Sequence, residues 1–577
     1  MAYSPLYNTH VEIDSFRGIY QDGDGYNQNM RLAREMENVN ISGGSFQPMR
    51  EGVRIEQTLT SPIGTLAYLH RRFGQDTGTL LVAVSDGAVY TKLLDADDDW
   101  VERYTGLSVN DCDWITYEVS TYALYSDAKT YQLGERCTIL SDPADEYSDR
   151  IPYRCTVAID TAEAWNPDHW EEITQTDPVD ILLFSNATDG MYCLYGDTLD
   201  VAPVETPKRF GVLARYNERI WGSGITGDPD MLVYSAPYDP FDWEAQIEIP
   251  EDGAGDIQVP TWDGDSFQAL RQYGSDLIAI KRNSIWRIYG TNPGEFTVQR
   301  QYGGGSLVEN TVAVHNGYAY MLGQYGLLRY DGSGAYAFQQ EAVRDIMQEK
   351  VQHKVSALQY NPNHTYAIGT VCIHEDVPYR CVVSINTAEE WTPAHWQAIP
   401  GDPVNNACAG MWNGVYCLAI PLNGSANNNA ILQYDTATGA FSLRTEVSVD
   451  SFLQINERLF YTSADYPGVV YEMDDRKGNV KFAKWISGYQ DLGLKSSIKS
   501  AFTLYMMVES EVPIPLRLGI RTEKKLKQKI ITTKPGKLTR VHLNNQGREF
   551  RLEIESYTAA PFTIAGGIKL DLELDPD

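Results

Sequence analysis

The sequence predicts an all-β protein: a β-propeller of about seven blades with two small β insertions and a C-terminal β-sandwich. Two observations indicate this fold. Short apolar runs separated by tight polar turns recur along the chain, and none is long enough for a typical helix. The composition, with 37 Tyr and 47 Gly against 16 Phe, favours strands and tight turns. A chain of 577 residues is also too long for one ordinary core.

The repeating unit is a strand, turn, strand, turn meander, clearest between Phe210 and Gly290. A small antiparallel meander must bury its faces against neighbouring copies, and radial packing into a propeller does this while leaving only short edges. We expect the propeller to span residues 56–475. The seven copies fall at 64–90, 181–195, 210–243, 267–290, 312–331, 410–435 and 452–474.

The segments on either side of the repeats differ from them. Residues 1–55 are expected to form an extended lead-in with a short polar helix at 28–36, and the Gly-rich cluster Asp22–Gly25 fits a turn better than a calcium loop. Residues 476–577 contain alternating apolar and polar runs typical of half-buried strands, which predicts a separate β-sandwich. Within the body, residues 339–354 predict one amphipathic helix that packs on the strands, with a partner-binding role as the alternative.

Two segments that resemble each other interrupt the repeats, at 131–175 and 366–400. Each contains two cysteines and a set of aromatic residues in the same order. The aromatic side chains either form the small core that a module of this size needs or provide flat faces on which a sugar ring can stack. The candidate glycan contacts are Tyr153, Trp165, Trp170, Tyr379, Trp391 and Trp396.

The cysteines follow the same duplication. Cys137 and Cys155 lie in the first insertion, and Cys372 and Cys381 in the second. Paired CxxC motifs are absent, so a zinc site is not predicted. Buried free thiols are the default expectation, and a disulfide within each insertion is the alternative. Cys193 and Cys417 occur in similar strands that follow the insertions.

The charge is distributed unevenly. The formal net charge is −31, which argues against a protein that coats nucleic acid with its whole surface. Residues 476–551 nevertheless hold 17 Lys and Arg against five Asp and Glu, a net of +12, so the remainder carries −43. The basic residues could contact phosphate or dock on an acidic neighbouring subunit. They are Arg521, Lys524, Lys525, Lys527, Lys529, Lys534, Lys537 and Arg540.

The sequence offers little for catalysis. It has no Gly-x-Ser-x-Gly elbow, no His-Glu-x-x-His pair and no phosphate-binding Gly-x-x-x-x-Gly-Lys loop. We therefore expect no catalytic residue, cofactor or metal site, and keep a glycosidase that uses a pair of Asp and Glu as an alternative. A signal peptide and a membrane-spanning apolar stretch are also not visible, which predicts synthesis in the cytosol.

Four segments carry a resemblance to a known family. They are Glu37–Phe46 with Arg50–Gly52, Tyr234–Trp243, Ile278–Gly290 and Gly547–Glu555. In these segments the chain resembles the β-propeller tail proteins of tailed bacteriophages, a group that includes the nozzle (tail tubular protein B) of short-tailed phages and the packaged-DNA stabilisation proteins. The similarity covers roughly residues 15 to 575 without the insertions.

The insertions resemble small chitin- or carbohydrate-binding modules, which have Tyr, Gly, Tyr, Pro and Trp in that order. The matching residues are Tyr131, Gly134, Tyr153, Pro167 and Trp170 in the first insertion and Tyr366, Gly369, Tyr379, Pro393 and Trp396 in the second. The cysteines depart from that pattern.

The resemblance to the tail proteins implies a virion structural protein without catalytic activity. It implies a homo-hexameric ring in the virion tail, below the head-to-tail adaptor, whose channel retains and then conducts genomic DNA and which supports tail fibres or spikes. The resemblance of the insertions implies a second hypothesis, an adhesin that binds host surface glycan. The two hypotheses are compatible, since the insertions could decorate a tail ring.

Overall fold

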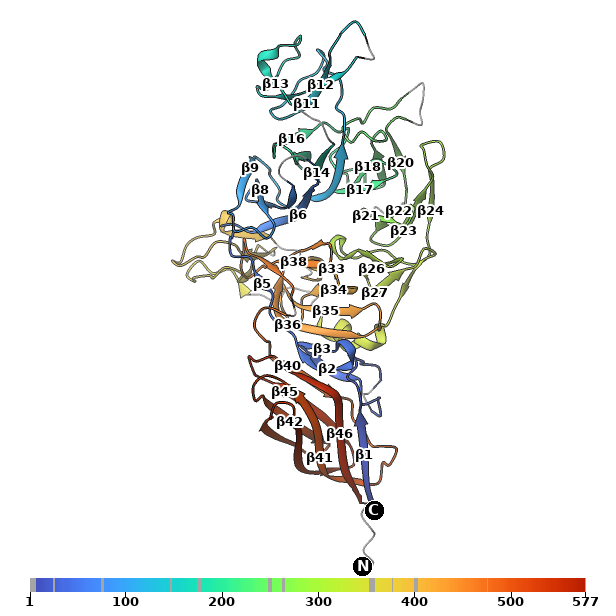
Figure 1. The fold of residues 1–577 in the computed structure, drawn as a ribbon, viewed down its shortest axis with the longest axis vertical. Helices are drawn as coiled ribbons and strands as arrows, with labels where there is room; N and C mark the ends of the chain where they lie inside the picture. The colour runs from blue at the N-terminus through green and yellow to red at the C-terminus, as the bar shows by residue number, and fades with distance from the viewer. Residues whose placement is uncertain are drawn as a thin grey trace, which may run out of the picture. The chain divides into compact units, whose positions relative to one another are not determined.

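A computed structural model describes residues 7–23, 26–73, 77–145, 148–173, 178–246, 252–261, 265–351, 358–375, 377–398, 403–474 and 476–575. The chain forms two compact units (Figure 1). Unit 1 contains Met1–Arg54, Ala337–Asp465 and Tyr471–Asp577, and unit 2 contains Ile55–Tyr336 and Tyr466–Val470. The architecture confirms the predicted fold class, with strands throughout and only short helical turns.

The first five repeats each form a four-stranded antiparallel meander, the blade unit of a propeller. In each sheet the strands follow in chain order. The strands are β6 Ile63–Arg71, β7 Gly78–Ser85, β8 Ala88–Leu93 and β9 Val101–Thr105; β10 Asp113–Val119, β14 Val179–Asn186, β15 Gly190–Tyr195 and β16 Val201–Val204; β17 Val212–Tyr216, β18 Arg219–Ser223, β19 Met231–Tyr234 and β20 Gly255–Gln258; β21 Phe267–Tyr273, β22 Asp276–Lys281, β23 Ile285–Tyr289 and β24 Thr297–Arg300; and β25 Ala313–His315, β26 Tyr318–Gly323, β27 Gly326–Tyr330 and β28 Ala335–Ala337.

Two further blades lie in unit 1, except for Val470 at the start of β39. One consists of β33 Cys408–Trp412, β34 Val415–Ile420, β35 Asn428–Asp435 and β36 Phe441–Val449. The other joins β37 Phe452–Ile455, β38 Arg458–Thr462 and β39 Val470–Glu472 to an outer strand from the N-terminal segment, β5 Val53–Arg54, through the pairs Tyr471–Arg54 and Glu472–Val53. All seven predicted repeats are therefore blades, and the last is completed by the lead-in.

Tight turns set the register of the blades. Asp86-Gly87, Asn316-Gly317 and Asn413-Gly414 each form a two-residue loop with positive φ at both positions. This is the turn whose twist matches that of the flanking strands, and Asn or Asp followed by Gly adopts it at low cost. The sequence signal for these hairpins is therefore local.

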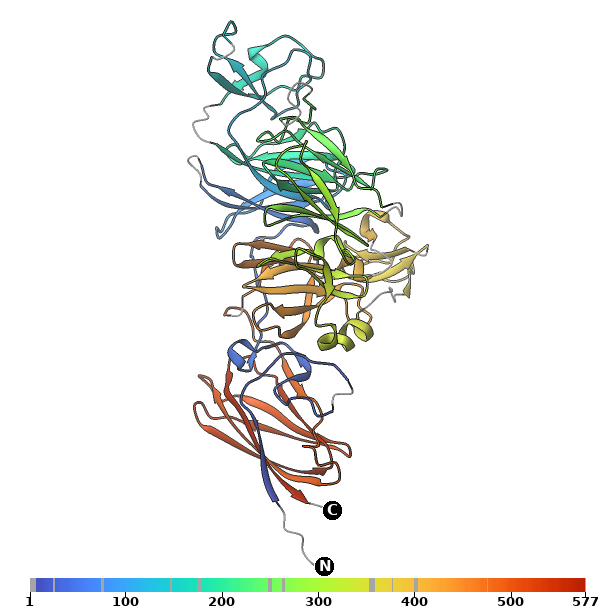
Figure 2. The same ribbon diagram turned by 90° about the vertical axis from the view of Figure 1, so that its right-hand side faces the viewer.

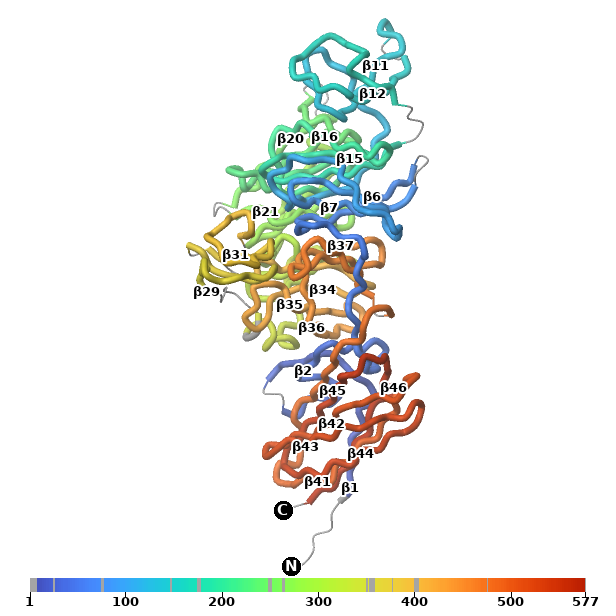
Figure 3. The backbone as a smooth tube through the Cα atoms, turned by 90° about the vertical axis from the view of Figure 1, so that its left-hand side faces the viewer, coloured from blue at the N-terminus to red at the C-terminus, as the bar shows by residue number. Residues whose placement is uncertain are grey.

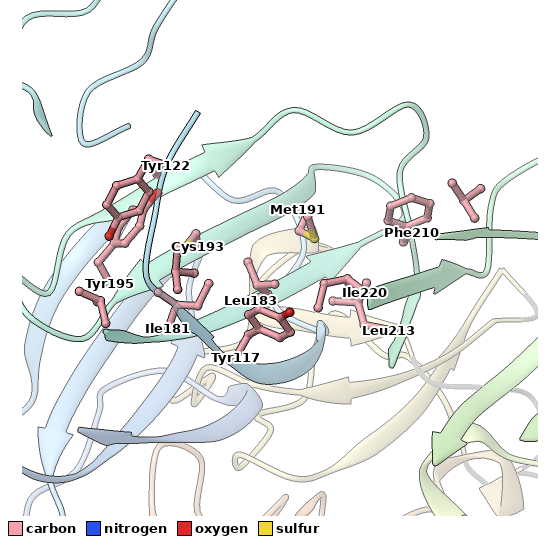
Figure 4. Close-up of a cluster of buried hydrophobic side chains, with 14 of the residues drawn as sticks. Tyr117, Tyr122, Ile181, Leu183, Met191, Cys193, Tyr195, Phe210, Leu213 and Ile220 are labelled. Atoms are coloured by element: carbon pink, nitrogen blue, oxygen red, sulfur yellow. The ribbon is translucent and has the colours of Figure 1, made fainter. Parts of the chain in front are cut away.

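The faces of the blades are buried against one another. Figure 4 shows one such cluster, where Ile181, Leu183 and Cys193 of the second blade lie near Leu213 and Ile220 of the third. All five side chains are at most 1% exposed. Nearly continuous apolar strands such as β14 are thus explained by burial on both faces.

The C-terminal sandwich has two sheets, with strand orders β1-β46-β41-β44 and β2-β40-β45-β42-β43. Phe502 of one sheet contacts Phe550 of the other at a ring centroid distance of 5.1 Å. The strands are β1 Tyr7–Ile13, β2 Ala33–Glu37, β40 Ala483–Ser487, β41 Ile498–Glu509, β42 Pro515–Thr522, β43 Leu526–Thr532, β44 Leu538–Gly547, β45 Phe550–Ser556 and β46 Thr563–Asp575.

The lead-in is part of this sandwich, which the sequence alone did not indicate. Figure 2 shows the blue β1 lying along the red C-terminal strands, and β1 pairs with β46 over seven residues. The predicted helix at 28–36 is wrong: the segment enters β2, where Ala33 and Met36 are buried at 0% and 1% exposure. Burial of these side chains between sheets overrides the helical propensity of the segment. A short ladder of β3 Val39–Asn40 with β4 Gln47–Pro48 follows around a 3-10 turn, η1 Ser42–Gly44.

The amphipathic helix of residues 339–354 is shorter and less regular than predicted. It consists of a 3-10 turn, η4 Gln340–Val343, and a π-helical turn, η5 Ile346–Lys350. Val343 and Ile346 are buried as the periodicity predicts. Residues 352–354 lie outside the described residues. Another 3-10 turn, η3 Glu309–Thr311, precedes β25.

Candidate functional site

Both insertions are small β modules. Module 1, within the second blade between β10 and β14, contains β11 Arg136–Leu140, β12 Arg150–Cys155, η2 Pro167–His169 and β13 Trp170–Glu172. Module 2, between the fifth and sixth blade sheets in the chain, contains β29 Leu358–Gln359, β30 Val371–His374, β31 Val377–Cys381, η6 Pro393–His395 and β32 Trp396–Ala398, followed by η7 Pro403–Asn406. Figure 3 shows β29 and β31 on one side of the blade strands of their own unit.

The modules begin before the predicted boundaries at 131 and 366. Leu124 pairs with Thr138 in parallel, as Gln359 pairs with Ile373. These first strands bring Tyr125 and Tyr360 into the modules. The sequence analysis missed both tyrosines, although the Tyr-x5-Tyr spacing to Tyr131 and Tyr366 is the same in the two segments.

Trp170 and Trp396 form the centre of the module cores. Each is only 6% exposed, and each packs edge-on against two tyrosines, with ring centroids 5.0–5.7 Å apart. Their indole N–H groups have no hydrogen-bond partner among the described residues. The structure gives both tryptophans a core position, the alternative that the sequence left open, and presents no face of either to a ligand.

The other four candidate glycan contacts are half-buried. The ring centroids of Trp165 and Tyr153 lie 4.9 Å apart, and those of Trp391 and Tyr379 lie 4.8 Å apart. Each pair is a T-shaped contact between a ring of the sheet and a ring of the loop that follows it. The sequence therefore predicted the right residues to lie together, and the prediction that they contact a glycan stays a prediction.

A histidine and a glutamate close the loop that holds the half-buried tryptophan. Nδ1 of His169 lies 2.6 Å from Oε1 of Glu163, and Nδ1 of His395 lies 2.6 Å from Oε1 of Glu389. The main-chain oxygen of Glu163 also accepts a hydrogen bond from the Tyr125 hydroxyl at 2.9 Å. Both glutamates thus tie the loop to the module core, and the sequence analysis did not single out either pair.

The module cysteines are free thiols and are buried. Cys155 is paired with Trp170 in the sheet, and Cys381 with Trp396. Burial raises the pKa of the Cys155 thiol to about 11, so the thiol is protonated at neutral pH and is a poor nucleophile or metal ligand. Cys193 and Cys417 are also buried free thiols but occupy different blade strands, the third (β15) and the second (β34).

The predicted basic residues lie around strand β43 and the adjoining turns of the sandwich. Arg521 is already paired with a carboxylate, because its Nε donates a hydrogen bond to Glu553 at 2.7 Å. The exposed lysines have no carboxylate within salt-bridge distance among the described residues. They are Lys524, Lys525, Lys527, Lys529, Lys534 and Lys537.

Two carboxyl groups in unit 2 come together from distant parts of the sequence. Asp113 begins β10, and Glu309 is in η3. Burial, and after it the neighbouring charges of Asp113 and Asp111, raise the pKa of Glu309 to about 8 against the opposing effect of Arg271. Burial also raises the pKa of Asp113. The pair therefore favours a bound proton.

A cavity of about 580 Å³ lies in unit 1 between the lead-in and the last two blades. Trp412, Asp435 and Glu457 line it, and its Arg458 is already bonded to Glu472 by two contacts of 2.6 and 2.8 Å. The described part of the chain contains no group of three or more His, Cys, Asp or Glu that could hold a metal ion. No helix among the described residues is long and apolar enough to cross a membrane.

Comparison with known proteins adds little to these observations. No protein-family model matches the chain, and no curated protein matches it. Among solved structures, the chain is similar to BamB from Moraxella catarrhalis, with 12% identity over 62% of this chain and 97% of that chain and a TM-score of 0.26. It is also similar to a catalytically inactive virginiamycin B lyase from Staphylococcus aureus with quinupristin, with 10% identity over 73% and 97% of the two chains and a TM-score of 0.31. At these TM-scores the similarity carries no argument about function.

Proposed function

We propose that this protein is a structural subunit of a phage tail: a ring below the head-to-tail adaptor that retains and conducts DNA. The observation that supports the proposal best is the separation of charge. Six exposed lysines that form no salt bridge among the described residues gather around β43, whereas the chain outside residues 476–551 carries −43. A surface of one sign on an oppositely charged chain favours head-to-tail contacts between copies, and such contacts form a ring when the rotation between copies closes.

The position of the lysines favours contact through side chains. Lys527 and Lys529 pair with Ile520 and Leu518 of β42, so they project on the face of the sheet that carries the core, at its outer edge. Charged residues at this position prevent unspecific addition of a strand. The lysines are then available to an acidic partner surface without exposing β43 to aggregation.

An acidic body also suits the passage of DNA. Like charge keeps a DNA duplex from adhering to a protein wall, because no counterions are released by contact. The resemblance of the sequence to phage tail proteins supports this role. Tail fibres or spikes are the expected further partners.

The mass of the native assembly tests the ring. We expect mass photometry of purified protein, with and without its tail neighbours, to give a species near six times 64.8 kDa. Reversing Lys527 and Lys529 to Glu should dissociate it, whereas reversing the already paired Arg521 should have less effect on assembly. A monomer under all conditions would contradict the ring.

The second candidate function is glycan binding by the modules. It is favoured by the duplication of a half-buried Trp–Tyr pair in two modules of the same chain. Retention on chitin beads should fall when Trp165 and Trp391 are both changed to Ala, and unchanged retention, or none by the wild type, would exclude this function.

A further inference from the structure

The two modules repeat one set of ring contacts. Stacking of the paired tyrosines, Tyr125 on Tyr131 and Tyr360 on Tyr366, has centroid distances of 5.2 and 5.3 Å. The two tryptophans of each module also stack, at 5.4 Å in module 1 and 5.1 Å in module 2. Because the shared contacts differ by only a few tenths of an ångström, any further contact in one module alone stands out.

Module 2 has such a contact on the candidate glycan residue. The imidazole of His374 lies on the indole of Trp391 with ring centroids 4.0 Å apart and planes inclined by 4°. Trp391 therefore has two nearly parallel rings against it, His374 and Trp396, whereas the described rings near Trp165 include one, Trp170.

The sequence explains the difference. His374 follows Cys372 by two residues, and the residue two after Cys137 in module 1 is Ile139. His374 ends β30 and pairs with Val377, and Ile139 holds the same strand position in β11, where it pairs with Ile151. The different residue at this strand position thus places an aromatic ring where module 1 has an aliphatic side chain.

We propose that the two modules are unequal sites, and that His374 determines the difference by covering the face of Trp391 that a sugar ring would use. A sugar binds an indole by lying flat on it, and a face that already carries a parallel ring at 4.0 Å is not free for that contact. A sugar ring would then stack on Trp165 of module 1 and not on Trp391 of module 2. The consequence for sugar binding rests on the second candidate function, whereas the cover, that is the stacking of His374 on Trp391, does not depend on that function.

The cover is tested without a ligand by hydroxyl-radical footprinting of the full chain, read by mass spectrometry. We expect Trp165 to be oxidised faster than Trp391, and His374→Ile to raise the rate at Trp391 toward that of Trp165. Val383→Ala, at an exposed position of the same module, is the control and should leave both rates unchanged. Equal rates in the wild type, or no response to His374→Ile or to the smaller His374→Ala, would overturn the proposal.

Binding to chitin beads tests its consequence. Trp165→Ala should weaken retention by about three- to tenfold, the effect of losing one stacking contact, while Trp391→Ala should change it less than twofold. Adding His374→Ile to Trp165→Ala should restore binding through module 2. A larger loss from Trp391→Ala would overturn the assignment to module 1. No retention of the wild type, with the footprinting difference present, would refute glycan binding and leave the cover in place.

Discussion

Modules 1 and 2 have aromatic cores with the same ring contacts, but they differ in the ion pairs that hold each module to its own unit. In module 1, Arg136 binds both carboxylate oxygens of Asp197 at 2.7 and 2.9 Å, and Arg154 binds Asp200 at 2.6 Å. In module 2, Arg380, which corresponds to Arg154, makes one contact of 3.1 Å with Asp450.

Arg136 has no counterpart in module 2, where Val371 takes its place. Its side chain is 0% exposed and its guanidinium lies 4.0 Å from the ring centre of Tyr195. The aromatic core is thus formed within each module, whereas the ion pair that anchors module 1, Arg136 with Asp197, depends on a residue of the second blade. Four changes test this division, from the largest expected effect to the smallest.

The largest effect should come from Trp170→Ala and Trp396→Ala. Each removes a buried indole from a small core, at a cost of about 3–5 kcal/mol, which is comparable to the whole stability of such a module. We expect hydrogen exchange to report unfolding of the module concerned while the blades stay protected. Because the ring contacts are the same, the two variants should behave alike, and unfolding of only one module would break the comparison.

Loss of the anchoring arginine should destabilise module 1, whereas the matched change in module 2 should have little effect. Arg136→Ala leaves Asp197 without its partner, and we expect a loss of about 2–3 kcal/mol, below the usual cost of breaking a buried ion pair because Asp197 keeps some access to water. Thermal unfolding with module-resolved hydrogen exchange measures it. The matched change Val371→Ala in module 2 should cost less. A larger effect from Val371→Ala would show that the anchors are equivalent after all.

Glu135 should make module 1 sensitive to pH. Burial raises its pKa to about 7, and the corresponding residue of module 2 is Thr370. A carboxyl group with a raised pKa in the folded state binds its proton more tightly when folded, so stability falls as pH rises from about 4.5 toward 7. Hydrogen exchange corrected for intrinsic rates should show module 1 loosening between pH 5 and 8. Glu135→Gln should remove this trend, and a similar trend in module 2 would contradict the assignment.

The smallest effects should come from the paired loop residues. Glu163→Gln and Glu389→Gln weaken the contact with His169 or His395, and partly exposed pairs of this kind contribute about 0.2–1 kcal/mol. We expect slightly faster exchange in the loop around Trp165 or Trp391, equal in the two modules. A difference between the modules would indicate that the loops are held by other contacts.

Local features of the sequence predicted much of the fold. Short apolar runs separated by tight polar turns located all seven blades, and the resemblance between the two interrupting segments located both modules. These signals succeed because a hairpin and its turn are neighbours in the chain. The helix at 28–36 failed for the opposite reason, since burial of Ala33 and Met36 depends on strands more than 400 residues away.

The same distinction applies to the candidate sites. The sequence by itself determined six of the aromatic residues that gather in the modules, though not Tyr125 and Tyr360, and that basic residues concentrate near the C-terminus. Only the tertiary structure decided that Trp170 and Trp396 are core, that Arg521 is paired with Glu553, and that His374 covers Trp391. Composition and order specify which side chains are present, but exposure and pairing depend on contacts between segments that the chain brings together only when it folds.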